Sequence, residues 1–224
     1  MRSNKYIHRE RRYIMQPSYI DIKKAVTKSQ HCQRNFDLSK EIPEQDLDIL
    51  EYAATNCPSK QNIAFYKLHV ITDRALIEEI HPHTWGTHAY TADGAMVATT
   101  NSQTLANAIF VYELVELEDL SEAAQGKWEK SDDAEYAIFL RDRAVAIGIA
   151  SGYVNLTAAM LGYSTGCCQC FDVSTVKDLL GLKRLPEMIQ GIGFKDETRN
   201  RREHEKNGLV FPTRKKEAIE VTRR

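Results

Sequence analysis

Residues 144–171 read AVAIGIASGYVNLTAAMLGYSTGCCQCF and carry no formally charged side chain, although 27% of the 224 residues in the chain are Asp, Glu, Lys or Arg. Such a segment is expected to be buried. It is longer than the roughly 20 apolar residues that a membrane span requires, but Gly, Ser, Asn, Thr and Tyr dilute it, which favours a soluble protein with no membrane association. The pattern predicts a central helix to about Tyr163 and then a short buried strand at Ser164–Gln169.

Small residues in this helix, Gly148, Ser151 and Gly152, would let a second helix approach closely. A helix that is uncharged all round needs apolar partners on every side, and the other predicted helices are few and amphipathic. We therefore expect a second copy of the chain to cover one side of the helix, in an obligate homodimer.

The chain on either side of this stretch alternates between helical and strand patterns. Helices are predicted at Tyr19–His31, at Glu44–Thr55 with Pro43 as a first-turn proline, at Arg74–Ile80 after the N-cap Asp73, and at Val173–Leu180 after the N-cap Asp172. Strands are predicted at Ala64–Thr72, Ala106–Leu117 and Met188–Phe194. The segment His81–Gln103 has little periodicity and is long enough to form a functional loop or lid.

Length and charge indicate one enzyme-sized domain. We expect a single domain over 1–224, with an N-terminal arm at 1–17 and a C-terminal arm at 195–224. The net charge of −1 gives no electrostatic case for nucleic acid as a partner. The amino terminus has no apolar core long enough for a secretory signal, so we expect a cytoplasmic protein.

Five cysteines, an odd number, argue against a disulfide framework in a reducing compartment. Cys167, Cys168 and Cys170 concentrate three thiols, but neighbours on a strand point to opposite faces, whereas zinc sites use spacings that let thiolates converge. The irregularly spaced histidines of the loop are His81, His83 and His88. We expect no metal site, and small buried apolar side chains are the simpler interpretation of the cysteines.

Four motifs, in this order along the chain, resemble the nitroreductase family of FMN-dependent oxidoreductases. Residues 30–36 (QHCQRNF) are similar to the family's Arg-Arg/His-Ser-x-Arg/Lys-x-Phe, and residues 42–62 to its helix running into Ala-Pro-Ser-Ser-x-Asn. Residues 161–172 resemble the Leu-Gly segment that reaches the flavin, and residues 191–194 (GIGF) resemble the last strand before a basic arm. The resemblance covers about Ile20–Arg202, nearly the whole chain.

The resemblance implies a set of FMN-binding residues. Arginines suit the phosphate dianion because planar guanidinium groups match its oxygens in pairs. Side-chain amides suit the pyrimidine edge of the flavin, and a backbone N–H of Gln169 or Cys170 would donate to flavin N5. Cys167 and Cys168 would pack against the ring. The implied set is Gln30, His31, Cys32, Arg34, Pro58, Ser59, Asn62, Asn101, Gln103, Cys167, Cys168, Gln169, Cys170, Arg201 and Arg202. No side-chain acid or base is required, since the cofactor carries the reaction.

The resemblance also implies a fold and a function. The fold would be α+β, with a mixed, mostly antiparallel sheet flanked by helices, in an intertwined homodimer with FMN at the interface. NAD(P)H would reduce FMN, and an electron-poor acceptor such as a nitroaromatic, quinone or enone would then take the electrons in a ping-pong mechanism. The alternatives are a flavin-dependent dehalogenase or flavin-fragmenting enzyme on the same fold, a flavin-binding protein without turnover, and a thiol metal-binding module.

Overall fold

A four-stranded antiparallel sheet forms the centre of the protein in the computed structural model. Its strands lie in the order β1 (Tyr66–Ile71), β4 (Ala108–Leu114), β6 (Pro186–Gly193) and β5 (Ser164–Cys168). A separate short hairpin pairs β2 (Ala89–Tyr90) with β3 (Met96–Val97). The structure describes residues 18–85, 89–90, 96–97, 102–128, 132–203, 210 and 216–223. The predicted N-terminal arm, 1–17, lies outside the described residues.

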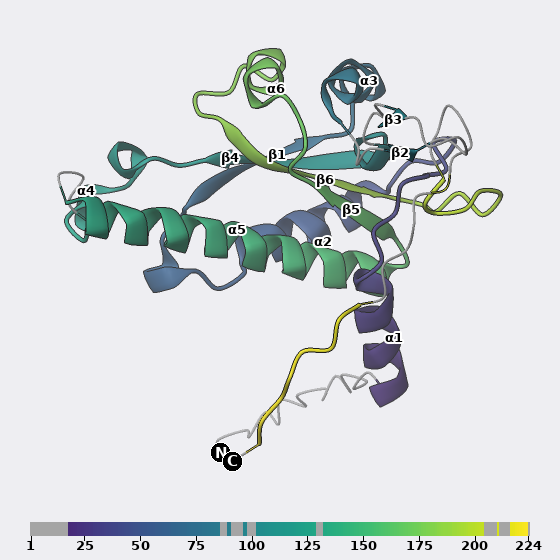
Figure 1. The fold of residues 1–224 in the computed structure, drawn as a ribbon, viewed down its shortest axis with the longest axis horizontal. Helices are drawn as coiled ribbons and strands as arrows, with labels where there is room; N and C mark the ends of the chain where they lie inside the picture. Colours follow the sequence, from purple (N-terminus) through teal and green to yellow (C-terminus); the bar gives the residue numbers. More distant parts are fainter. Residues whose placement is uncertain are drawn as a thin grey trace, which may run out of the picture.

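Helices cover both faces of this sheet (Figure 1). α2 (Glu44–Thr55) and the long α5 (Asp133–Leu161) lie on one face, and α3 (Arg74–Ile80) and α6 (Val173–Leu179) lie on the other. α1 (Tyr19–Ser29) contacts α5 and points away from the sheet. The short helical elements are η1 (Lys60–Asn62), η2 (His81–His83), η3 (Ser102–Thr104), η4 (Leu117–Asp119) and α4 (Glu122–Gln125). The predicted α+β class, with an antiparallel sheet flanked by helices, is confirmed.

Most predicted boundaries are close to those in the structure. α2 and α3 begin and end as predicted, whereas α1 ends two residues before His31. Pro43 is the N-cap of α2 and not a residue of its first turn. The side chains of Asp73 and Asp172 accept backbone N–H groups of the following turns at 3.1 Å, so both predicted N-caps are confirmed. β1 and β4 are shorter than predicted, and β6 begins two residues earlier, at Pro186.

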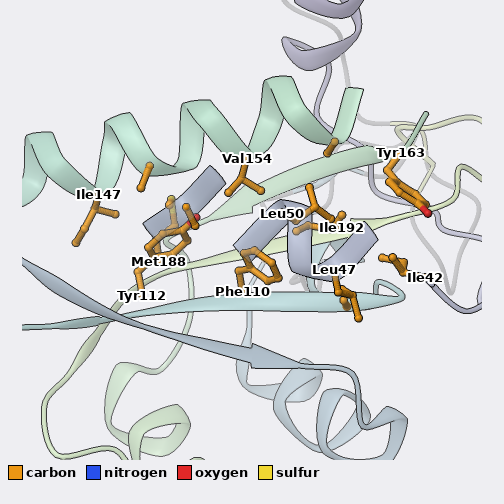
Figure 2. Packing of buried hydrophobic residues seen from close by; sticks show 14 residues of the cluster. Ile42, Leu47, Leu50, Phe110, Tyr112, Ile147, Val154, Tyr163, Met188 and Ile192 are labelled. Atoms are coloured by element: carbon orange, nitrogen blue, oxygen red, sulfur yellow. The ribbon is translucent and has the colours of Figure 1, made fainter. Parts of the chain in front are cut away.

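The alternation of side chains along β4 supplies two apolar layers. Phe110 and Tyr112 point toward α2 and α5, where they cluster with residues such as Leu50 (Figure 2). Ile109 and Val111 point to the opposite face and cluster with apolar residues of α3 and α6. Because neighbouring strand residues face opposite sides, a strand that is apolar throughout can bury both sets only between two layers of helices.

A chain of side-chain hydrogen bonds joins α5 to the sheet inside the first layer. The buried Gln190 on β6 accepts a hydrogen bond from Tyr112 OH at 2.7 Å and donates one to Asn155 Oδ1 at 2.9 Å. Thr165 Oγ1 also donates to Asn155 Oδ1, at 2.6 Å, and Asn155 Nδ2 lies 3.7 Å from Cys167 Sγ. Buried polar groups are costly unless paired, so this network holds α5 in one position over three strands.

α5 is buried on its inner side only. Val145, Tyr153 and Met160 are 52%, 46% and 66% exposed on the outer side. A Cβ built at Gly148 or Gly152 would meet no atom of the described chain within 4 Å. The expected burial of the uncharged stretch therefore holds, within one chain, for the inner side alone. Among the described residues, α5 is also the one helix long and apolar enough to cross a membrane by length and composition, but its inner side forms part of the core.

Two glycines let the segment before β4 and the segment after α1 lie directly on the sheet. A Cβ built at Gly191 would lie 1.9 Å from Gln103 O, and one at Gly166 would lie 2.6 Å from Gln33 O. Real Cβ atoms do not approach backbone oxygens so closely, so a larger residue at either position must displace the facing segment. The absence of side chains at these two positions brings Gln33 and Gln103 to the same edge of the sheet.

Replacing Gly191 by alanine should therefore destabilise the protein, by about 1 to 3 kcal/mol or more. The added methyl group must push Gln103 off β6. Urea denaturation followed by circular dichroism measures the free energy of unfolding. Gly126→Ala is the matched control, since its new Cβ meets no atom of the described chain within 4 Å. Equal stability of the two variants would contradict the close approach.

Candidate functional site

The segment that follows α1 meets β5 and the C-terminal segment at one edge of the sheet. Gln33 N–H donates to Thr165 O at 2.8 Å, and Arg34 N–H donates to Arg201 O at 3.0 Å. Arg201 Nη1 in turn donates to Cys32 O at 3.0 Å, across 169 positions of sequence. Cys32 also forms a parallel bridge with Thr165. Two regions predicted separately to bind a cofactor are thus in direct contact.

Asn35 holds the C-terminal segment in place at this edge. Its Nδ2 donates to Asn200 O at 2.8 Å and to Glu203 O at 2.6 Å, and Asp196 N–H donates to Asn35 O at 3.1 Å. An antiparallel bridge between Phe36 and the residue before Asp196 extends the contact. Residues 195–203 of the predicted C-terminal arm therefore fold back onto their own chain.

Positive charge is concentrated around the Cys32 thiol. Burial lowers the pKa of the Arg34 guanidinium, and the charge of Arg202 lowers it further. Burial also disfavours the charged form of Cys32 and so raises the pKa of its thiol, with a smaller contribution from Cys167. The charges of Arg34, Arg202 and Arg201 lower this pKa. The guanidinium groups repel one another at this edge, so an anion bound between them would relieve an unfavourable interaction.

Gln103 reaches the same edge from the segment before β4. Its buried side chain donates from Nε2 to Cys32 Sγ. The next residue, Thr104, has its Oγ1 3.1 Å from Nδ1 of the buried His81. The structure therefore brings the predicted Gln103 to the arginine cluster. The predicted Asn101, like His88, lies outside the described residues.

The end of β5 and the residues after it complete this edge. Cys167 packs toward α5, where its Sγ lies 3.3 Å from Ser151 Oγ, whereas the buried Cys168 packs toward α3 and α6. The two thiols point to opposite faces, so both side chains cannot pack against one flat ring as expected. Cys170 N–H donates to Cys168 Sγ at 3.2 Å. Of the two predicted backbone donors, the amide of Gln169 therefore remains the candidate.

Other predicted residues lie at the rim of the site or far from it. Gln30 is the C-cap of α1, and it and His31 are exposed immediately before Cys32. Among the described residues, no three His, Cys, Asp or Glu side chains are grouped so that they could hold a metal ion.

The predicted residues Pro58, Ser59 and Asn62 belong to a different part of the chain. The adjacent Lys60 pairs with Asp142 at 2.5 Å, early in α5. Cys167 contacts Asn155, thirteen residues later on the same helix, which corresponds to about 20 Å at a rise of about 1.5 Å per residue. Ser59 and Asn62 line their own cavity of about 370 Å³ between α2 and β1. One chain therefore does not bring these residues to the arginine cluster.

Sequence reasoning did not identify two residues that contact the site. Asn155 was not singled out, although a polar residue within an apolar helix is a signal for a buried hydrogen bond. Trp85 falls within the aperiodic segment His81–Gln103, yet its backbone N–H donates to Cys170 O at 2.9 Å. Its pairing partner is distant in sequence, so no local pattern indicates this contact.

Sequence comparison finds similarity to nitroreductases. The model of the nitroreductase family matches residues 27–194. A curated protein from Staphylococcus aureus (strain USA300), provisionally named an NAD(P)H nitroreductase, is 25% identical over 175 residues, covering 71% of this chain and 77% of that protein.

Structural comparison finds a similar fold in several solved proteins. A nitroreductase family protein from Streptococcus pneumoniae TIGR4 matches with a TM-score of 0.61 and 16% identity, over 92% of this chain and 100% of that chain. A provisionally named nitroreductase from Exiguobacterium sibiricum 255-15, solved in complex with FMN, matches with a TM-score of 0.58 and 15% identity, over 90% and 94%. The gut-bacterial enone reductase CLA-ER matches with a TM-score of 0.57 and 16% identity, over 83% and 89%. At these identities the similarity concerns the fold.

The environment of the thiols predicts their order of alkylation. Cys170 is exposed, whereas Cys32 is half-buried with a raised pKa, so at pH 7.5 iodoacetamide should modify Cys170 well before Cys32. Peptide mass spectrometry over a time course gives both rates. The Cys32 rate should keep rising with pH above 9, since its thiolate forms late. Modification of Cys32 as fast as Cys170 would contradict its burial.

Proposed function

The chain belongs to the nitroreductase family, and on this premise we propose that it is an FMN-dependent oxidoreductase that uses NAD(P)H. One observation carries the proposal. Arg34 and the neighbouring pair Arg201 and Arg202, which lie far apart in the sequence, converge beside Cys32 at the edge of the sheet. We further propose that the protein acts in the cytoplasm.

The arginine cluster fits the phosphate of FMN. The phosphate is a dianion, and guanidinium groups donate to its oxygens in planar pairs. The partial burial of Arg34 strengthens its attraction for an anion, because the local dielectric is lower than in water. Gln30 and His31, exposed at the end of α1, would contact the ribityl chain and phosphate from the rim.

Gln103 and the residues after β5 fit the flavin ring. The Gln103 amide can donate and accept hydrogen bonds together, as a pyrimidine edge requires. The backbone N–H of Gln169 would donate to flavin N5, and a backbone donor neither titrates nor moves. Of the two thiols on opposite faces, the half-buried Cys167 would lie nearer the ring, and the buried Cys168 would contribute through its backbone.

Bound FMN would supply the redox chemistry, taking a hydride from NAD(P)H and passing electrons to a nitroaromatic, quinone or enone in ping-pong order. The residues of this chain would neutralise the phosphate and orient the ring. The names of the relatives support this reaction class: NAD(P)H nitroreductase in Staphylococcus aureus, an FMN complex in Exiguobacterium sibiricum, and an enone reductase.

We also propose that the protein is an intertwined homodimer formed through α1 and the outer side of α5. Tyr19, Ile22 and Val26 of α1 are 87%, 47% and 52% exposed, although they have the spacing of a buried helix face. A mainly apolar groove of about 430 Å³ lies between α1 and α5, lined by Ile22, Ala25, Leu156 and Met160 among others. A monomer rarely leaves so large a contiguous apolar surface in water.

The separation of the predicted cofactor residues also supports a dimer. Lys60, between Ser59 and Asn62, pairs with Asp142 of α5, about 20 Å along the helix from Asn155, which contacts Cys167 of β5. A second copy related by a twofold axis across α5 would place its Ser59 and Asn62 beside the first copy's Arg34. Each FMN site would then draw on both chains, as isologous interfaces allow.

Purified protein should bind FMN at about one molecule per chain, and NAD(P)H should bleach the bound flavin in the absence of oxygen. Arg34→Ala should weaken FMN binding about 10- to 100-fold, since hydrogen bonds to a charged group are lost. Riboflavin binding should change little, because riboflavin has no phosphate. Fluorescence titration measures both ligands.

The matched control for this titration is Arg199→Ala, because Arg199 pairs with Glu203 outside the cluster. Equal weakening of FMN and riboflavin by Arg34→Ala would remove Arg34 from the phosphate site. Protein that binds FMN but is not reduced by NAD(P)H would be a flavin-binding protein or a different flavoenzyme. Protein that binds no FMN would end the proposal.

Gly152→Leu should dissociate the dimer and release FMN with it. A Cβ at Gly152 meets no atom of the described chain within 4 Å, so we expect the clash of the larger side chain to come from a second copy and to cost about 1 to 3 kcal/mol or more. Light scattering with flavin absorbance on the same sample reports both events. Gly126→Leu, whose Cβ also meets no described atom within 4 Å but which lies at the C-cap of α4, should leave both unchanged. A Gly152→Leu monomer that retains FMN would contradict the shared site.

A further inference from the structure

Backbone hydrogen bonds tie the loop after α3 to the residues that follow β5. Trp85 N–H donates to Cys170 O at 2.9 Å, and Asp172 N–H donates to His83 O at 2.9 Å. Between them, Thr84 forms an antiparallel bridge with the residue after Cys170. The loop is therefore fixed beside the Gln169 amide, the candidate donor to flavin N5.

Buried side-chain contacts also hold this loop in place. Thr84 Oγ1 donates to His81 O at 2.7 Å and lies 3.3 Å from Thr104 Oγ1. His81 Nδ1 contacts the same Thr104 hydroxyl at 3.1 Å. Thr104 follows Gln103, whose amide contacts Cys32. The loop therefore contacts both parts of the chain that fit the flavin ring. One is Thr104, next to Gln103, and the other is the segment 170–172 after β5.

Trp85 is exposed on this fixed loop. The sequence contains two tryptophans. Trp128 is 5% exposed and packs edge-on against Phe65 and Phe139, whereas Trp85 is 53% exposed. An indole that stays half in water gives up much of the free energy that burial would provide. Because its backbone is held in place, the exposure of Trp85 is a property of the folded protein, and its indole is accessible to a bound ring.

We propose that the Trp85 indole forms one wall of the acceptor subsite and favours planar, electron-poor rings such as quinones and nitroaromatics. This inference rests on the proposed function, since it is the position of the Gln169 amide that places Trp85 next to the reacting edge of the flavin. An electron-rich indole stacks well on an electron-poor ring, because the two quadrupoles are complementary.

The same argument predicts different effects of Trp85 on the binding of the acceptor and of the electron donor, NAD(P)H. The dihydronicotinamide ring of NAD(P)H is itself electron-rich, so it gains less from an indole than a quinone does. Removal of the indole should therefore affect quinone binding and leave the reduction of FMN by NAD(P)H nearly unchanged. A purely structural role of Trp85 would alter both steps, through a displaced β5.

The test uses FMN-loaded, oxidised protein and 1,4-naphthoquinone. Isothermal titration calorimetry gives the Kd of the quinone for wild type, Trp85→Leu, Trp85→Phe and the control Trp128→Phe. Trp85→Leu should raise the Kd about 2- to 10-fold, the range expected for loss of an aromatic pair, and Trp85→Phe should recover part of the loss. Stopped-flow absorbance then measures flavin reduction by NAD(P)H and reoxidation by naphthoquinone or by ferricyanide, which has no ring to stack.

The subsite is supported if Trp85→Leu weakens naphthoquinone binding and slows reoxidation by naphthoquinone, while flavin reduction and reoxidation by ferricyanide stay as in wild type. An unchanged Kd, an equal loss with ferricyanide, or an equal effect of Trp128→Phe would overturn it. If wild-type protein fails to bind FMN, the proposed function fails first, and the acceptor subsite fails with it. That outcome is distinct from a wild-type enzyme that binds FMN and a Trp85→Leu variant with the same Kd and the same rates, which would overturn the subsite alone.

Discussion

The hydrogen bond from Gln33 N–H to Thr165 O is the contact on which the candidate site depends. It fastens the segment after α1 to β5, and the next residue, Arg34, then bonds to Arg201 in the C-terminal segment. Gly166 allows this approach, since a Cβ there would collide with the Gln33 carbonyl. Three segments distant in sequence therefore meet because one position lacks a side chain, and the buried charge of Arg34 is a result of that meeting.

The sheet and the helices that follow local rules could be predicted from the sequence. α2 and α3 have clear apolar spacing, and the Asp73 and Asp172 caps mark helix starts by a local hydrogen bond. Sequence could not give the exposure of α1, because an apolar face looks the same whether its own chain or another chain covers it. It could not show that Lys60, next to Ser59, and Cys167 contact α5 thirteen residues apart, since motif order carries no distance.

Residues of the candidate site were predicted best where the family motif and elementary chemistry agree. Arg34 and Arg201 are both cationic and both converge. The orientation of the thiols was harder to predict. Strand neighbours face opposite sides, which argues against a zinc site here, and the same rule also prevents Cys167 and Cys168 from both packing against one ring. Asn155 and Gln190 were missed because their partners come from three different elements, and a buried network has no sequence period.

In the proposed dimer, the exposed apolar surface of α1 and α5 would link folding to chain concentration. Exposed residues such as Ile20 and Met160 would gain their burial only when two copies meet, so part of the stabilising free energy of the dimer would depend on mass action. Dilution would then loosen α1, and with it the segment that carries Cys32 and Arg34 into the site. A cell that makes little of this protein would hold a larger fraction of it without cofactor, and added FMN would favour assembly by the same coupling.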